Sequence, residues 1–416
     1  MKVVIMAIGS RGDIAPYTGL AASLRERGHD VAIATQEPFA DMARECGAEY
    51  RHLSGDMKAE LASEDGRKWT ENGTGLRNLR ATLAIGKRMM HSLGESTLAA
   101  AEGADVLMLQ RGVMVHGYLI AKATGVPAMG LELFPGMPTA EFPPPMFGTR
   151  SLGRWGNREL VRLAAPLPTP IDGVLKEFQR KLGLPELGLT RTRFQMLDDE
   201  NFLMPHGFSP AVLPRPADWR RGADVVGYWW SYQDPNWQPP TDLVDFLDAG
   251  PAPVFIGFGS MATGEGERLS ELISATLRRL PGVRAVVQAG WAGMRVAGDQ
   301  VLTIGSVPHG WLFPRMAAVV HHGGAGTTGA GVRAGVPAVL TPVLGDQPFW
   351  AARLRAIGVS PGSVLFKKLT AESLSELIRQ AVTDPGYAAR AAEIGARVRA
   401  EDGAARVAEA LERIPA

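Results

Sequence analysis

The sequence predicts an α/β fold made of two doubly wound domains, each a parallel β-sheet covered by helices on both faces. Three observations lead to this prediction. The chain has 416 residues, about two to three times the length of a usual domain. Short apolar runs rich in Val and Ile alternate with stretches of helical periodicity, which is typical of parallel sheets. This alternation occurs once in each half of the chain, and a proline-rich segment separates the two occurrences.

The first half begins with a strand, a loop and a helix. Apolar residues spaced by three and four from Ile14 to Leu24 predict the helix, and Gly28 ends it. Strands are predicted at residues 2–8, 31–35, 105–109 and 127–131. Strands that alternate with helices in this way favour a parallel sheet buried on both faces.

The middle of the chain is expected to be rich in loops, because 16 of the 30 prolines fall between residues 132 and 240. Beyond it the alternation starts again, with strands predicted at residues 253–258, 284–288, 301–304, 317–320 and 337–340. We therefore expect an N-terminal domain at 1–218, a linker at 219–240 and a C-terminal domain at 241–395. A last helix at 396–416 could pack back on the first domain.

Composition excludes several classes of protein. With 45% hydrophobic and 21% charged residues the chain should fold, and a formal charge of +1 argues against a nucleic-acid partner. A single cysteine, Cys46, cannot form an internal disulfide, and the chain does not open with a secretory signal pattern. No apolar run reaches the roughly 18 residues of a membrane span. We expect a cytoplasmic protein.

The segment His-His-Gly-Gly-Ala-Gly-Thr-Thr at 321–328 carries the strongest chemical signal. It directly follows the strand predicted at 317–320 and begins a helix. Glycines let the backbone approach a ligand closely, and the free N–H groups of a helix start favour an anion. A phosphate site is the natural interpretation, and a tight strand-to-helix turn without a ligand is the simpler alternative.

The same segment also fits a dinucleotide fingerprint. Residues 324–329 match G-x-G-x-x-G, and Asp346 lies at about the distance of the ribose-binding acid, which would indicate an NAD(P)-dependent oxidoreductase. That acid should end a strand, however, whereas Asp346 follows a further loop at 342–345. The two histidines also have no role in such a fingerprint.

Taken together, several motifs resemble one family. The 321–328 segment, Ala-Gly-Val-Pro at 334–337 and Gly-Asp-Gln-Pro-Phe-Trp at 345–350 resemble the donor-binding signature of family 1 nucleotide-sugar glycosyltransferases. Three further motifs are similar to the branch of sterol glucosyltransferases and bacterial natural-product glycosyltransferases: Gly-Ser-Arg-Gly-Asp at 9–13, Phe-Ile-Gly-Phe-Gly-Ser-Met at 255–261 and Ser-Val-Pro-His-Gly-Trp-Leu-Phe at 306–313. The resemblance implies the GT-B fold, in which two Rossmann-like domains face each other across a deep cleft. The first domain would bind the acceptor and the second the donor.

The resemblance also implies roles for individual residues. Asp13 would be the catalytic base, although an N-cap for the following helix is an alternative; Asp105 is a candidate partner for it. His321 is expected to be structural. The residues implied in donor binding are Ser260, His322, Gly324, Gly326 and Thr327 for the diphosphate, Asp346 and Gln347 for the sugar, and Trp291, Ser306, Val307 and His309 for the nucleobase.

The expected activity is inverting, metal-independent transfer of a hexose to a hydroxyl of a lipophilic small molecule, such as a sterol, macrolide, polyketide or polyphenol. No Asp-x-Asp or zinc-site spacing is evident, and no cofactor is expected beyond the nucleotide sugar. Ala330 stands where plant relatives have a ribose-binding glutamate, which leaves UDP and dTDP donors open; UDP-glucose is favoured. A nucleotide-sugar-binding protein without turnover is an alternative.

Overall fold

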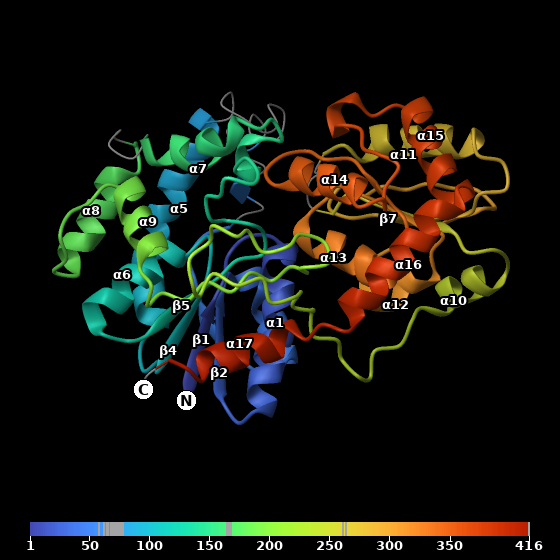
Figure 1. Ribbon diagram of the computed structural model, residues 1–416. Helices are drawn as coiled ribbons and strands as arrows, with labels where there is room; N and C mark the ends of the chain where they lie inside the picture. Colours follow the sequence, from blue (N-terminus) through green and yellow to red (C-terminus); the bar gives the residue numbers. More distant parts are fainter. Residues whose placement is uncertain are drawn as a thin grey trace. The chain divides into compact units, whose positions relative to one another are not determined.

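The computed structural model describes residues 1–56, 59–60, 63, 66, 79–163, 169–259, 262 and 264–414 (Figure 1). The chain divides into two units. Unit 1 consists of Met1–Pro210, Pro214–Asp234 and Glu401–Ala416, and unit 2 of Ala211–Leu213 and Pro235–Ala400. None of the described helices is long and apolar enough to cross a membrane.

The described part of unit 1 holds a five-stranded parallel sheet with the strand order β3-β2-β1-β4-β5. Its strands are β1 (Lys2–Met6), β2 (Asp30–Thr35), β3 (Glu49–His52), β4 (Val106–Gln110) and β5 (Ala128–Leu131). The four strands predicted for the first half are all present. The sequence analysis missed β3, because this edge strand reads Glu-Tyr-Arg-His and shows no apolar run.

Side chains of β1 alternate between two cores on opposite faces of this sheet. Val3 and Ile5 pack with α1 (Arg11–Glu26), α2 (Ala40–Glu45) and α17 (Gly403–Leu411). Val4 and Met6 pack on the other face with helices that include α5 (Leu79–Ala100), α6 (Met114–Thr124), α8 (Asp172–Lys181) and α9 (Leu189–Asp198). Helix α7 (Gly153–Leu163) precedes α8 in the chain.

The last helix, α17, belongs to unit 1 and lies beside α1 (Figure 1). Its buried residues Val407 and Leu411 join the core that contains β1. The packing at its start is close: a Cβ atom on Gly403 would lie 2.5 Å from the Gly227 carbonyl oxygen. Glycine at position 403 is what allows this approach.

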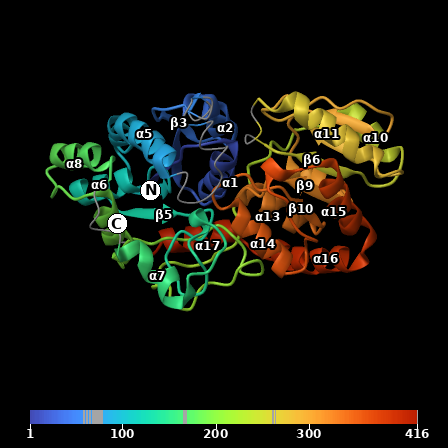
Figure 2. The same cartoon turned by 90° about the horizontal axis from the view of Figure 1, so that it is seen from above.

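The described part of unit 2 holds a second five-stranded parallel sheet, ordered β10-β9-β6-β7-β8. Figure 2 shows β6, β9 and β10 of this sheet beside one another. Its strands are β6 (Val254–Gly257), β7 (Ala285–Gln288), β8 (Val301–Ile304), β9 (Ala318–His321) and β10 (Ala338–Leu340). Its helices include α10 (Thr241–Asp248), α11 (Gly266–Arg278), α12 (His309–Leu312), α13 (Ala325–Ala334), α14 (Gln347–Ala356), α15 (Ala371–Thr383) and α16 (Pro385–Arg399). Helices α11 and α15 pack on the sheet face that contains Val254 and Ile256.

The strand orders locate the places where ligands bind in such sheets. Each order reverses beside the first strand of its unit, between β1 and β4 in unit 1 and between β6 and β9 in unit 2. Ligands of open α/β sheets bind outside the carboxyl ends of the strands at this reversal. The loops that follow β1 and β9 are therefore the first places to look for chemistry.

Candidate active site

In unit 2, the turn between β9 and α13 leads into an accessible helix start. Gly323 has φ +90°, which turns the chain into Gly324, the N-cap of α13. The first intrahelical bond runs from the Thr328 amide to the Gly324 carbonyl at 2.9 Å, so the preceding N–H groups need other partners. No acidic side chain lies in the first turn. Gly326 is exposed and Thr327 half-buried, so the positive end of the helix dipole is accessible.

His322 stands beside this helix start. A Cβ atom on Gly324 would lie 2.5 Å from His322 Nε2, and one on Gly259, after β6, would lie 3.0 Å from His322 Cε1. The ring therefore fits between two glycines that leave room for it. Burial lowers the pKa of His322 to about 4, so at neutral pH the imidazole is uncharged and offers one N–H donor.

His321, the last residue of β9, has a structural role. It is fully buried, and its Nδ1 accepts a hydrogen bond from the Gly323 amide at 3.1 Å. This bond requires an unprotonated Nδ1, and burial together with the nearby His322 and His309 lowers the pKa of His321. The His321 side chain therefore stabilises the turn between β9 and α13.

The residues expected to bind the nucleobase follow the other strands of the same sheet. Trp291 comes after β7, is half-buried, and its amide donates to the Gly259 carbonyl at 3.3 Å. Ser306 is exposed after β8, whereas the Val307 side chain is buried, so only the Val307 backbone is available to a ligand. The His309 ring stacks on Phe313 with centroids 4.3 Å apart.

Asp346 and Gln347 follow β10 and lie at the start of α14. The Asp346 side chain does not cap this helix; its Oδ2 accepts a hydrogen bond from Trp350 Nε1 at 2.7 Å. Gln347 Oε1 accepts from the Val343 and Leu344 amides at 2.8 and 3.2 Å. A Cβ atom on Gly323 would lie 3.3 Å from the Gln347 carbonyl oxygen, so this pair adjoins the β9–α13 turn.

Ser260, which was expected to contact the diphosphate, lies outside the described residues. Among the residues that the structure does describe, no three His, Cys, Asp or Glu side chains are grouped so as to hold a metal ion.

In unit 1, Asp13 lies in the first turn of α1, after β1. Ser10, and not Asp13, is the N-cap of this helix. The Ser10 amide and the Ser10 hydroxyl both donate to Asp13 Oδ2, each at 2.8 Å. Gly9 has φ +135°, and a Cβ atom there would lie 2.5 Å from the same oxygen, so the loop needs glycine at this position. Burial raises the pKa of Asp13, and the hydrogen bonds from Ser10 oppose this increase. A carboxylate with a raised pKa is suited to accept a proton.

Asp105 is not the partner of Asp13. It immediately precedes β4, and its Oδ2 accepts a hydrogen bond from the Lys2 amide at 2.6 Å. Both groups lie at the amino ends of parallel strands, whereas Asp13 follows the carboxyl end of β1. The strand predicted at 105–109 in a parallel sheet already argued against pairing Asp105 with Asp13.

The sequence analysis missed an ion pair after β4 and β5 whose carboxylate is buried. Glu132 is 1% exposed, and its Oε1 accepts from Arg111 Nη1 at 2.8 Å. Burial, followed by the charges of Glu132 and Asp13, raises the pKa of Tyr17, whose hydroxyl donates to the Leu131 carbonyl at 3.2 Å. Charged side chains directly after two predicted strands were the available signal.

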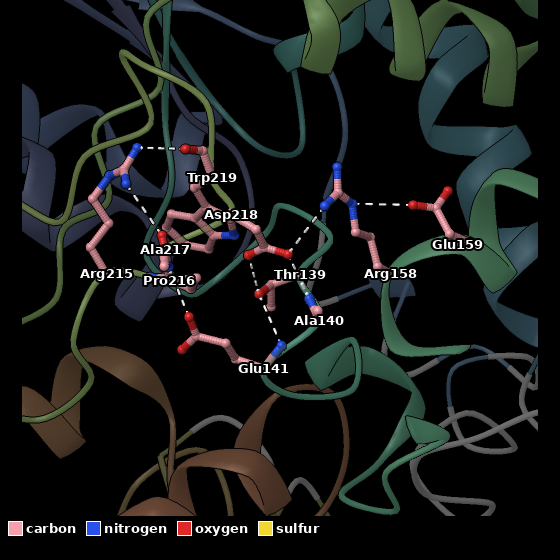
Figure 3. Close-up of polar contacts among 10 residues, drawn as sticks. All are labelled: Thr139, Ala140, Glu141, Arg158, Glu159, Arg215, Pro216, Ala217, Asp218 and Trp219. Atoms are coloured by element: carbon pink, nitrogen blue, oxygen red, sulfur yellow. Dashed lines mark hydrogen bonds and ion pairs between the residues drawn. The ribbon is translucent and has the colours of Figure 1, made fainter. Parts of the chain in front are cut away.

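Asp218 accepts hydrogen bonds from the proline-rich loop that follows β5 (Figure 3). Asp218 Oδ1 accepts from the Thr139 hydroxyl at 2.6 Å, and Oδ2 accepts from the Ala140 amide at 2.8 Å. Glu141 Oε1 in turn accepts from the Ala217 amide at 2.8 Å, and Arg158 Nη1 forms an ion pair with Asp218 Oδ2 at 3.7 Å. These bonds hold the loop against residues 217–218.

The geometry disfavours the oxidoreductase alternative. Gly326 and Gly329 lie inside α13, and Asp346 follows β10 only after a loop and begins α14. The ribose-binding acid of a dinucleotide site would end the strand. The structure therefore defines a two-unit α/β protein, with an accessible helix start after β9 and a hydrogen-bonded carboxylate after β1.

Comparisons with known proteins agree with this class. The model of the glycosyltransferase family 28 N-terminal domain matches residues 3–98, and that of the erythromycin biosynthesis protein CIII-like C-terminal domain matches residues 285–414. The chain is 33% identical to O-mycaminosyltylonolide 6-deoxyallosyltransferase of Streptomyces fradiae, over 97% of this chain and 95% of that protein. It is 31% identical to a sterol 3-beta-glucosyltransferase of Arabidopsis thaliana, over 99% of this chain but only 65% of the longer plant protein.

Solved structures share the fold. A glycosyltransferase of kitacinnamycin superposes with a TM-score of 0.73 at 18% identity, covering 100% of this chain and 99% of that one. A Streptomyces glycosyltransferase complexed with thymidine diphosphate gives 0.66 at 21% identity, with 99% of each chain covered.

The chain therefore belongs to the family 1 nucleotide-sugar glycosyltransferases with the GT-B fold. Within them it falls in the branch of sterol glucosyltransferases and bacterial natural-product glycosyltransferases.

Proposed function

We propose that the protein transfers a hexose from UDP-glucose, with inversion and without a metal ion, to a hydroxyl of a lipophilic natural product or sterol. The observation that carries the proposal is the β9–α13 turn: an accessible helix start, free of acidic side chains, with the neutral imidazole of His322 beside it. Helix dipoles and fixed N–H donors stabilise the charge that develops on a departing diphosphate.

Asp13 serves as the base in this proposal. Its carboxylate takes the proton of the acceptor hydroxyl as the oxygen attacks the anomeric carbon, and the diphosphate leaves from the opposite face of the sugar. The attack is direct, so the configuration at that carbon inverts. The raised pKa of Asp13 brings its proton affinity closer to that of a general base working near neutral pH.

The donor residues divide by the strand that they follow. Residues His322, Gly324, Gly326 and Thr327 bind the diphosphate, together with Ser260. Asp346 and Gln347 bind the sugar, and the segment 306–309 with Trp291 binds the nucleobase. The choice of glucose is supported by the plant relative, whose name specifies glucosyl transfer to a sterol; the Streptomyces relative is named for a 6-deoxyallosyl group.

Two experiments test the proposal. A screen of UDP-glucose and TDP-glucose against a panel of hydrophobic alcohols, with mass spectrometry of the products, should detect a mass increase of one hexose in the UDP-glucose series. The variant Asp13→Asn should lose transfer by about a hundredfold or more while its affinity for UDP is kept. Undiminished turnover in Asp13→Asn would remove Asp13 from catalysis, and nucleotide binding without turnover in the wild type would indicate a binding protein.

A further inference from the structure

The hydrogen bond between Trp350 and Asp346 is unusual for a helix start. An aspartate at an N-cap usually accepts from the amides of the first turn. The Asp346 carboxylate makes no such bond, although Asp346 occupies the N-cap of α14. It accepts instead from the indole N–H of Trp350, one turn along the helix, at 2.7 Å.

Trp350 can restrict the motion of the Asp346 carboxylate, because its own side chain is held by the core. It is 0% exposed, and it is among the largest fully buried side chains. Its ring packs against Phe349 with centroids 5.4 Å apart, so the indole cannot turn without disturbing the core. A charge-assisted bond from an immobile donor restricts where the accepting oxygen of the carboxylate can lie.

Gln347 is fixed in a complementary way. Its Oε1 accepts from two consecutive loop amides, those of Val343 and Leu344. The N–H2 end of the side chain therefore points away from that loop. Asp346 offers a fixed acceptor and Gln347 a fixed donor, and the two are neighbours beside the β9–α13 turn.

We infer that Trp350 is a positioning residue that sets the donor-sugar specificity of this site. Trp350 orients Asp346 so that its carboxylate can accept a hydrogen bond from one sugar hydroxyl. The Gln347 amide can donate to a second sugar oxygen. The site then selects hexoses that carry these hydroxyls over deoxysugars that lack them. The inference rests on the proposed donor site and adds the residue through which that site discriminates.

The test uses Trp350→Phe in the full chain, because phenylalanine keeps a buried ring and removes only the indole N–H. The matched control is Trp229→Phe: Trp229 is 3% exposed, and within the described part of the chain its Nε1 has no hydrogen-bond partner. kcat/KM is measured for UDP-glucose and for its 2-, 3-, 4- and 6-deoxy analogues. Affinity for UDP alone is measured by calorimetry.

Wild type and Trp229→Phe should reject at least one deoxy analogue by about tenfold or more, since a buried polar group would be left unpaired. Trp350→Phe should lose most of that discrimination while its affinity for UDP is unchanged. Its effect should also be non-additive with Asp346→Asn.

Two results would overturn the inference: equal losses for UDP-glucose and every analogue in Trp350→Phe, or full additivity with Asp346→Asn. Absence of UDP binding in the wild type is a different outcome, because it would contradict the proposed function itself.

Discussion

Ser10 donates two hydrogen bonds to one oxygen of Asp13, from its amide and from its hydroxyl, each at 2.8 Å. Both bonds stabilise the charged carboxylate and so lower its pKa, against the increase that burial causes. Ser10 is thus both the N-cap residue of α1 and the group that tunes the proposed base.

Ser10→Ala should therefore shift the pH dependence of transfer. Removal of the hydroxyl raises the pKa of Asp13, so the acidic limb of the kcat/KM profile moves to higher pH. Ser10→Thr keeps a hydroxyl and should retain the wild-type profile. An acidic limb that does not move in Ser10→Ala would mean that another group is the base.

The Asp218 contacts of Figure 3 lead to a prediction about the acceptor. Asp218→Asn weakens the bonds to Thr139 and Ala140, which hold the proline-rich loop after β5. We propose that this loop lines the acceptor site. KM for the acceptor should rise by roughly tenfold, the effect of about 1.5 kcal/mol, while KM for UDP-glucose stays the same. Glu159→Gln is the control, because Glu159 bonds Arg158 and not the loop. An equal rise in both KM values would contradict a role confined to the acceptor.

Two buried histidines of unit 1 should make the protein sensitive to acid. Burial lowers the pKa of His116 to about 4 and that of His206 to about 3. The neutral forms stabilise the fold above the ordinary pKa of about 6.5, and this stability is lost as the pH falls below it. At pH 5 each of these two histidines should lower the free energy of unfolding by about 2 kcal/mol.

Urea unfolding of His116→Gln at pH 7 and pH 5 tests this expectation. The variant should lose less stability between the two pH values than the wild type does. His91→Gln, at an exposed histidine, should behave like the wild type. If His116→Gln loses as much unfolding free energy between pH 7 and pH 5 as the wild type does, other groups cause the acid sensitivity.

The sequence predicted the parts of the site that depend on strand order. His322, Asp346 and Trp291 all follow strands of one parallel sheet, so their common edge could be derived from the β/α alternation. The expectation of a loop-rich middle was incomplete, because the prolines there separate helices: Pro185 lies between α8 and α9. An isolated proline ends a helix without excluding helices on either side.

Pairs that form through the tertiary structure could not be predicted in this way. Arg111 and Glu132 follow neighbouring strands, but only the packed sheet brings their side chains to 2.8 Å. The bond from Trp350 to Asp346 spans one helical turn, yet a capping role was equally compatible with the sequence. Asp105 is a different case, because the strand predicted at 105–109 already placed it at an amino end; the structure adds its actual partner, the Lys2 amide.

The central claim is that the β9–α13 turn binds the donor diphosphate, and calorimetric titration with UDP and TDP in the presence of EDTA tests it most directly. The wild type should bind at least one of the two nucleotides without a metal ion. His322→Ala should weaken that binding by roughly tenfold or more, and Asp13→Asn should leave it unchanged. No heat from either nucleotide, or equal affinity in His322→Ala, would contradict the claim.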